Sequence, residues 1–206
     1  MPRSETRERI ILAVREMILA EGLASLSVEQ VSRRLAMSKK TFYGIFRSKE
    51  ELIASVIERT LAELRANIIR IMSSPSDFPT KLQRFLGYLS LQANKIGIPM
   101  QRDLYRLPPE VIAHIATFRR ERITGSLTRL IQEGVEQGYV RADLDSRIAV
   151  LAYLGAVENV LDPSVLSNES FSARQAAQGI ITIFFKGILT SEAQHLVPAF
   201  DNASIS

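Results

Sequence analysis

Residues 31–52 read VSRRLAMSKKTFYGIFRSKEEL, and this stretch decides the fold of the N-terminal part of the chain. Apolar residues recur at helical spacing on both sides of a turn predicted at Ala36 and Met37: Val31, Leu35, Phe42 and Phe46. Ser38 follows the turn, where its hydroxyl can cap a new helix. We therefore expect two short helices that pack through their apolar sides and leave their polar sides free, the geometry of a helix-turn-helix.

The flanking sequence predicts the helices that support this motif. A first helix carries its apolar stripe on Ile10, Ile11, Val14, Met17 and Ile18. It stops at Gly22, and Ser27 caps the second helix. The third helix is expected from Lys39 to about Phe46. Ser48 and Glu51 form a capping box for a long fourth helix that ends at the Ser-Ser-Pro-Ser break of residues 73–76.

The remaining two thirds of the chain also have helical periodicity and no convincing strand pattern. Helices are expected over Thr80–Ile96, Pro99–Arg106, Pro109 to about Gln137, Arg147–Leu161 and Ser172–Leu189. The fold class is therefore all-α. We expect an N-terminal helix-turn-helix domain of residues 1–72, whose fourth helix links it to a helical regulatory and dimerisation domain of residues 73–206.

Composition excludes several classes of protein. Of the 206 residues, 46% are hydrophobic and 23% are charged, which is typical of a globular protein. The chain has no cysteine, which rules out disulfides and thiolate chemistry and favours the cytoplasm. The two longest uncharged helical runs, 148–157 and 175–185, are shorter than the ~20 apolar residues that span a bilayer, so no membrane partner is expected.

Charge is concentrated in the helix-turn-helix. The net charge is only +4, but residues 33–49 contain basic side chains and no acidic ones: Arg33, Arg34, Lys39, Lys40, Arg47 and Lys49. A local positive surface is what contact with DNA phosphates requires. Charge alone leaves a solvated surface equally open.

With these residues in view, the stretch 31–52 resembles the DNA-binding domain of the TetR family of regulators. The family's signature positions are occupied by Ser38, Thr41, Phe42, Tyr43, Phe46, Ser48, Lys49, Glu50, Glu51 and Leu52. The strong resemblance covers about the first sixty residues. It implies a homodimeric transcriptional regulator of the repressor type that binds a near-palindromic double-stranded operator.

The resemblance also implies roles for individual residues. Tyr43 and Lys49 would hold phosphates, Ser27 and Ser38 would add contacts at helix starts, and Arg34 would add a backbone contact. Base edges would face Lys39, Lys40, Thr41 and Gly44, and either lysine could reach guanine O6 and N7.

Three positions depart from the family pattern. Ala36 replaces the usual turn glycine, Lys40 stands where glycine is frequent, and Gly44-Ile45 replaces a more typical pair. Inside a helix, Gly44 would cost roughly 1 kcal/mol relative to alanine. Two interpretations of Gly44 stay open: it permits close approach of the backbone to DNA, or it is neutral.

The family resemblance further implies that the C-terminal domain binds a small-molecule effector, with the fourth helix carrying the change to the DNA-binding domain. Candidate pocket residues are Phe85, Tyr88, Leu89, Met100, Leu104, Tyr105, His114 and Phe118, although apolar residues at helical spacing are more often core. The last two long helices are apolar nearly all round and rich in small residues. They suggest a dimer interface that contains Ala152, Tyr153, Gly155, Ala156, Ala176, Ile180, Ile183 and Phe184. Burial inside one subunit is the alternative.

Other functions have less support in the sequence. With two histidines, no phosphate-binding glycine loop and no ligand cluster with metal spacing, we expect no enzyme activity, no metal and no cofactor. The remaining alternative is a helical interaction module, or an architectural DNA binder without sequence preference and without an effector.

Overall fold

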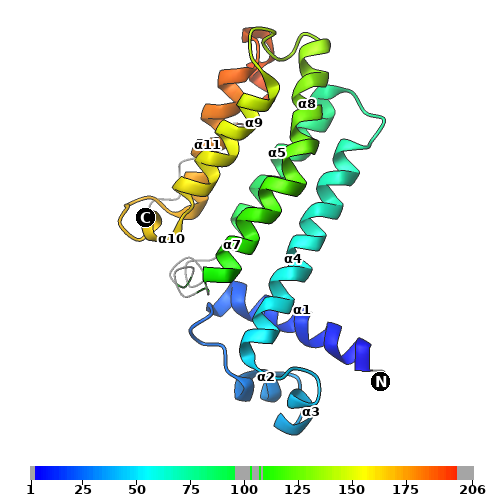
Figure 1. The fold of residues 1–206 in the computed structure, drawn as a ribbon, viewed down its shortest axis with the longest axis vertical. Helices are drawn as coiled ribbons and strands as arrows, with labels where there is room; N and C mark the ends of the chain where they lie inside the picture. The colour runs from blue at the N-terminus through cyan, green and yellow to red at the C-terminus, as the bar shows by residue number, and fades with distance from the viewer. Residues whose placement is uncertain (1–2, 96–102, 104–106, 108, 199–206) are drawn as a thin grey trace. The chain divides into compact units, whose positions relative to one another are not determined.

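A computed structural model describes residues 3–95, 103, 107 and 109–198 of the chain (Figure 1). The N-terminal helices are α1 (Arg3–Glu21), α2 (Val28–Arg34), α3 (Lys39–Tyr43) and α4 (Lys49–Met72). They are followed by α5 (Phe78–Asn94), α7 (Pro109–Phe118), the π-helical turn η2 (Arg119–Ile123), α8 (Thr124–Glu136), α9 (Ser146–Val160), α10 (Pro163–Leu166), α11 (Ala173–Ile188) and the 3-10 helix η3 (Ser191–Leu196). Within these ranges there is no strand beyond an isolated bridge between Val140 and Leu189, so the all-α prediction is confirmed.

The chain forms two compact units, and the first of them is discontinuous in sequence. Unit 1 comprises residues 1–64 and 96–112, and unit 2 comprises residues 65–95 and 113–206. Helices α4 and α7 therefore contribute residues to both units. In the described residues no helix has the length and apolar character needed to cross a membrane.

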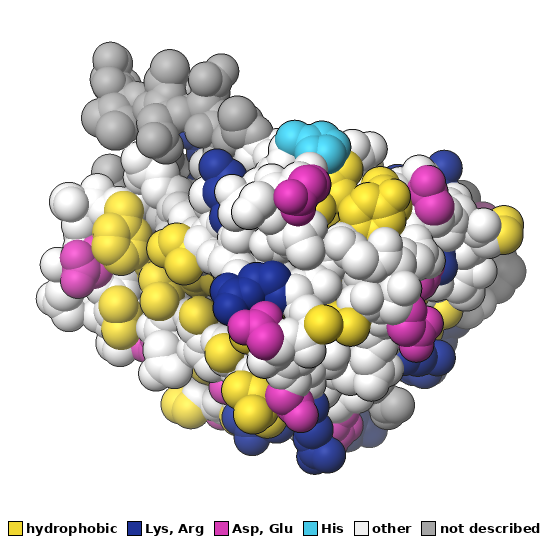
Figure 2. Space-filling model, turned by 90° about the horizontal axis from the view of Figure 1, so that it is seen from above, with side chains coloured by type: hydrophobic (Ala, Val, Ile, Leu, Met, Phe, Trp, Pro, Cys, Tyr) yellow, Lys and Arg dark blue, Asp and Glu magenta, His cyan; other side chains and the backbone are white. Residues whose placement is uncertain are grey.

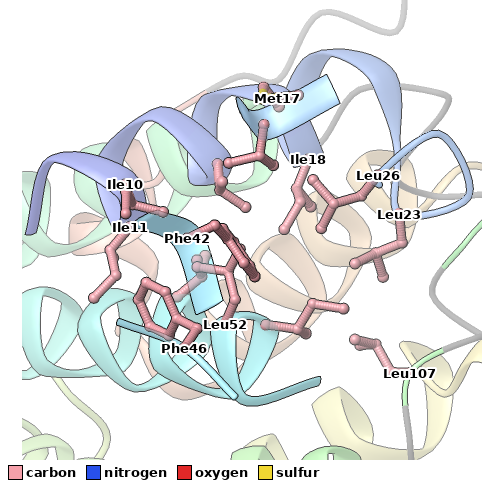
Figure 3. Packing of buried hydrophobic residues seen from close by; sticks show 14 residues of the cluster. Ile10, Ile11, Met17, Ile18, Leu23, Leu26, Phe42, Phe46, Leu52 and Leu107 are labelled. Atoms are coloured by element: carbon pink, nitrogen blue, oxygen red, sulfur yellow. The ribbon is translucent and has the colours of Figure 1, made fainter. Parts of the chain in front are cut away.

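Unit 1 is held together by one apolar cluster (Figure 3). Ile10 and Ile11 of α1 lie against Phe42, Phe46 and Leu52, which come from α3, the segment after it and α4. Leu107 joins this cluster from far along the chain, with Val111 and Ile112 packed against it. Burying a phenylalanine side chain contributes about 2–3 kcal/mol, so this cluster fixes how α2 and α3 are held.

Local chemistry explains where the first helices begin and end. Gly22 has φ 83°, a left-handed conformation that glycine adopts without strain, and it stops α1. Ser27 caps α2 by accepting a hydrogen bond from Gln30 N, and the Gln30 side chain accepts one from Ser27 N in return. Ala36 lies in the turn with φ 50°, a strained conformation for a residue with a Cβ. The turn thus has the glycine-type geometry without the glycine.

Several predicted boundaries are wrong in detail. The third helix ends at Tyr43 rather than near Phe46, because Gly44 is its C-cap. Glu51 accepts a hydrogen bond from Arg47 N instead of Ser48 N, so only the Ser48 half of the expected capping box forms. The helix expected over Pro109–Gln137 is interrupted by η2, and α10 and η3 were not predicted. The short helix expected over Pro99–Arg106 falls mainly outside the described residues.

Unit 2 is built from α5, α8, α9 and α11, which pack in neighbouring pairs (Figure 1). Helix α8 is closely approached at Gly134, where a Cβ would come within 2.5 Å of both the Phe78 ring and the Val140 side chain. The Phe78 ring in turn stacks on Tyr139 at a centroid distance of 5.4 Å. Only glycine fits at position 134, and it seats the end of α8 against the start of α5.

Candidate DNA-binding surface

Two neighbouring residues of the third helix, α3, have opposite surroundings: one side chain is buried in the core and the next is exposed to solvent. The Phe42 side chain is completely buried, whereas Tyr43 is 55% exposed, and the two rings meet edge to face at 5.4 Å. Lys39, Lys40 and Thr41 are exposed as well. We call the exposed side chains Lys39, Lys40, Thr41 and Tyr43 the α3 surface. Packing and exposure lie on opposite sides of α3, as the helix-turn-helix prediction required.

Hydroxyl groups organise the start of α3. The Ser38 Oγ accepts a hydrogen bond from Thr41 N at 3.0 Å and lies 2.9 Å from the Thr41 Oγ1. The predicted cap is therefore formed, and the same two hydroxyls are exposed to an approaching ligand. These two contacts with Ser38 orient the backbone and the hydroxyl of Thr41.

Lys49 lies beside the start of α2, although 22 positions separate it from Ser27 in sequence. Its Nζ donates to the carbonyl oxygen of Leu26 at 3.4 Å, directly before the cap residue Ser27. Both side chains are partly exposed. The two residues expected to hold phosphates from different helices are thus brought to one place on unit 1. The neighbouring Glu50 carboxyl has a lowered pKa, because its own backbone N–H and then the Ser48 hydroxyl hydrogen-bond to it.

Acidic side chains from outside the segment 33–49 compensate part of its positive charge, contrary to the sequence-based expectation. Glu29 lies between Arg33 and Lys39, with oxygen–nitrogen distances of 3.9 Å and 3.5 Å. Glu21 pairs with Arg34 at 3.4 Å. Both acids precede the counted window, which is why a count along the sequence missed them.

Among the described residues, no ion pair involves the Lys40 side chain, and its exposed ammonium faces solvent next to the paired Lys39. The two lysines of α3 thus stand in different electrostatic surroundings.

Gly44 does not lie inside a helix, so the predicted cost to helix stability does not apply. It is the C-cap of α3 with φ −69°, an ordinary conformation for any residue. A Cβ there would come within 3.3 Å of the Thr41 carbonyl oxygen. The glycine relieves this close backbone approach, which is a local reason for its presence.

Polar contacts that the sequence did not predict hold α1 to α4 inside unit 1. Arg59 pairs with Glu8 at 2.7 Å and with Glu63 at 3.2 Å, and Glu63 also pairs with Arg15. The hydrogen bond from Arg59 to Glu8 is the main cause of the raised pKa of Arg59.

A further contact ties a later part of the chain to the loop between α1 and α2. Asp103 is buried, and its Oδ2 accepts a hydrogen bond from Ala24 N at 2.6 Å. Ala24 lies in the loop between α1 and α2, so this later part of the chain supports the entry to α2.

The candidate effector residues are only partly described. Phe85 is buried and meets Phe185 edge to face, so it belongs to the core of unit 2. Tyr88, Leu89 and Phe118 are half-buried, and His114 is exposed. Met100, Leu104 and Tyr105 lie outside the described residues.

The predicted dimer residues divide into two groups. Tyr153, Ala176 and Ile180 are buried inside unit 2, as the alternative of burial within one subunit expected. Gly155, Ala156 and Phe184 are half-buried, whereas Ala152 is exposed and Ile183 is 78% exposed.

Two further apolar side chains of α9, which the sequence analysis did not single out, are also exposed: Ile148 at 68% and Leu151 at 50%. We call Ile148, Leu151, Ala152 and Ile183 the α9–α11 surface. Figure 2 shows hydrophobic side chains gathered on the left of the view, the side on which α9 and α11 lie in Figure 1.

Comparison with known proteins identifies both parts of the chain. Residues 10–56 match the family model for bacterial regulatory proteins of the tetR family. Residues 84–162 match the model for a tetracyclin repressor-like C-terminal domain. The first match contains α2, α3 and the start of α4, and thus all of the α3 surface.

Individual relatives agree with these matches over nearly their whole length. The chain is 23% identical to the uncharacterised HTH-type transcriptional regulator YvaF of Bacillus subtilis, covering 90% of this chain and 96% of that protein. A TetR-family regulator from Agrobacterium tumefaciens has the same fold, with a TM-score of 0.66, 17% identity and coverage of 92% and 100%. The regulator FadR of Bacillus subtilis, solved in complex with stearoyl-CoA, gives a TM-score of 0.60, 19% identity and coverage of 88% and 98%. The chain belongs to the TetR family and is a DNA-binding transcriptional regulator.

Proposed function

We propose that the protein is a homodimeric repressor that binds a near-palindromic operator through α2 and α3 and is released by a small molecule. One observation carries the proposal: α3 turns Phe42 into the core and leaves the α3 surface free. A recognition helix needs this division, because its buried side fixes its orientation while the other side enters the major groove.

On DNA, the two kinds of contact have different tasks. Tyr43, Lys49, Ser27 and Ser38 bind phosphates and set the position of the protein, because phosphate contacts carry no sequence information. Lys39, Lys40 and Thr41 read base edges, with Gly44 close by. Arg34 adds a backbone contact after leaving its partner Glu21.

Two copies of the chain pair through the α9–α11 surface. A monomer would keep Ile148 and Ile183 in water, two aliphatic side chains on helices that pack together, and exposed apolar surface of this kind is a mark of an interaction site. A twofold dimer presents two equivalent copies of α3, so its operator contains two related half-sites.

A small molecule bound by unit 2 releases the operator. Binding can do this only if the effector has different affinities for the DNA-competent and incompetent states. Helix α4 contributes to both units, as α7 does, and is a covalent path for the change. The FadR structure with stearoyl-CoA makes acyl-CoA thioesters the first effectors to test. Since the DNA of a bacterium lies in its cytoplasm, we place the protein there, without a catalytic role.

Specific recognition can be separated from architectural binding by competition. Footprinting of the DNA beside the protein's own gene supplies an operator, and binding is then measured with excess random duplex over a range of salt concentrations. Specific binding survives the competitor, typically with about 10³-fold or greater preference, whereas purely electrostatic binding is titrated away. Loss of all binding under competition would favour the architectural alternative.

Two lysine variants test the assigned roles within the same assay. Lys49→Ala should weaken binding to every sequence and lower the salt slope by about 1, because one phosphate contact is lost. Lys40→Ala should instead lose affinity mainly at one operator position. Equal weakening across all operator variants would contradict base reading by Lys40.

A further inference from the structure

Glu29 is an acidic side chain set among the basic residues of the helix-turn-helix. Its Oε2 lies 3.5 Å from Lys39 Nζ, and its Oε1 lies 3.9 Å from Arg33 Nη2. The contact with Lys39 joins α2 to the first residue of α3. The carboxylate therefore stands beside the α3 surface, which our proposed function assigns to DNA.

These contacts do little for the stability of the fold. The side chains of Glu29 and Lys39 are 64% and 59% exposed, and ion pairs in such surroundings contribute about 0–1 kcal/mol. Helix α2 already has its capping box, and the apolar cluster holds α3. The effect of Glu29 is therefore to be sought in binding.

A carboxylate at this place lowers attraction to DNA in general. Phosphate binding gains free energy when a cation displaces condensed counterions, and Lys39 already has an anionic partner. Lys39 must give up its contact with Glu29 in order to bind a phosphate. Lys40, one residue further along α3, carries no such restraint in the described structure.

The same pair matches the major-groove edge of a G·C base pair. Guanine presents two acceptors, N7 and O6, and cytosine presents the N4 amino donor beside them. The Lys39 ammonium is a donor and the Glu29 carboxylate is an acceptor, held next to each other before DNA arrives. An A·T pair presents its groups in a different order, with the adenine N6 donor between the adenine N7 and thymine O4 acceptors, whereas the cytosine N4 donor lies at the end of the G·C edge.

We propose that Glu29 is a specificity-determining residue, which holds Lys39 away from phosphates on random DNA and reads a G·C pair with it in each operator half-site. The inference rests on the proposed function, because it assumes that the α3 surface enters the major groove. It adds an acidic residue of α2 to a reading surface that the sequence analysis confined to α3.

The test compares Glu29→Gln with a matched control, Glu21→Gln. Both changes keep side-chain size and remove one exposed carboxylate that pairs with a cation of α2, and Glu29→Gln alone also releases a cation of α3. The probes are a duplex selected from a random-sequence library with the wild-type protein and a scrambled duplex of the same composition. Dissociation constants for both are measured by fluorescence anisotropy over a series of salt concentrations.

For Glu29→Gln we expect tighter binding to the scrambled duplex, by about three- to tenfold, and a salt slope steeper by up to about 0.9, because Lys39 gains a phosphate. The selected duplex should gain little or nothing, because the reading of its G·C pair is lost, so the ratio of the two affinities falls by about three- to tenfold. Glu21→Gln should change both affinities in parallel. An unchanged ratio in Glu29→Gln, or equal ratios in the two variants, would overturn the proposal.

Base substitution gives the second readout. Each G·C pair of the selected duplex is replaced by A·T in turn, and the wild type should lose affinity by about 5- to 100-fold at one symmetric position, the range for one mismatched pair. Glu29→Gln should lose this preference. Retention of the same preference would contradict reading by Glu29. If the wild type itself does not distinguish selected from scrambled DNA, the proposed function fails, independently of Glu29.

Discussion

The α3 surface and the α9–α11 surface both expose side chains to solvent, and these side chains differ in chemistry between the two surfaces. The first exposes two lysines, a threonine and the 55% exposed ring of Tyr43 over a tightly packed core. The second exposes aliphatic side chains, of which Ile183 is 78% exposed. A cationic, hydrogen-bonding surface suits a polyanion, whereas an aliphatic one gains free energy only against another apolar surface. Exposure marks both sites, and side-chain chemistry tells the partners apart.

The largest expected effect comes from removing the support behind the α3 surface. Phe42→Ala deletes a fully buried ring and should destabilise unit 1 by about 3–5 kcal/mol, the usual range for phenylalanine in a core. Chemical denaturation followed by circular dichroism measures the loss. Lys40→Ala, two positions earlier and exposed, is the control and should change stability by less than about 0.5 kcal/mol. Similar losses in both variants would show that α3 is not packed as described.

The next effect concerns the aliphatic surface. Ile183→Glu places a charge in the proposed subunit contact, where burial without a partner costs several kcal/mol. We therefore expect the dissociation constant of the dimer to rise by about 100-fold or more. Sedimentation velocity over a dilution series measures it, and operator affinity should fall with it. Leu91→Glu on α5 is the control, because Leu91 is 53% exposed and lies outside the proposed interface. A dimer unaffected by Ile183→Glu would exclude this surface as the subunit contact.

A smaller effect isolates one hydroxyl of the α3 surface. Tyr43→Phe keeps the ring that meets Phe42 and removes only the proposed hydrogen bond to a phosphate. Hydrogen bonds to charged groups contribute about 1.5–3 kcal/mol, so affinity should fall roughly tenfold or more for every DNA sequence. Anisotropy titrations with operator and random duplex test this. A loss confined to the operator would instead assign Tyr43 to base reading.

The smallest effect lies in the turn between α2 and α3. Ala36→Gly should stabilise unit 1 by about 0.5–1 kcal/mol, because φ 50° strains a residue with a Cβ. Ala62→Gly, the same substitution at an exposed position of α4 that belongs to unit 1, should destabilise by about 1 kcal/mol. The midpoints of the denaturation curves of the two variants should therefore shift in opposite directions relative to the wild type. Shifts of the same sign would refute the strain argument.

Sequence patterns predicted features whose causes are local. The caps at Ser27 and Ser38 and the stop at Gly22 depend on residues within three or four positions, and the structure confirms them. The end of α3 was missed, because Phe46 is buried like a helical residue and its N–H still bonds to the Phe42 carbonyl beyond the helix. The periodicity of apolar residues indicates which side of the chain is buried, and in this segment the buried side extends past the last turn of the helix.

Contacts between distant parts of the chain could not be predicted in the same way. The pairing of Glu29 with Lys39 needs the turn to be folded first, and a charge count along the sequence does not contain it. The bond from Ala24 to Asp103 joins residues 79 positions apart. The last helices read as apolar all round, but only the structure shows that Ile180 faces the core and Ile183 faces solvent.

The place of Asp103 and Leu107 inside unit 1 has a consequence for how the protein is made. A ribosome adds about 5–20 residues per second, so α1 to α4 emerge seconds before the segment that completes their core. Until residue 112 has left the exit tunnel, the nascent helix-turn-helix exposes the apolar site that Leu107 later fills. A gene fragment ending at residue 72 would keep the protein in that unfinished state, and a chimera built on this family member should carry residues 103–112 along with the N-terminal helices.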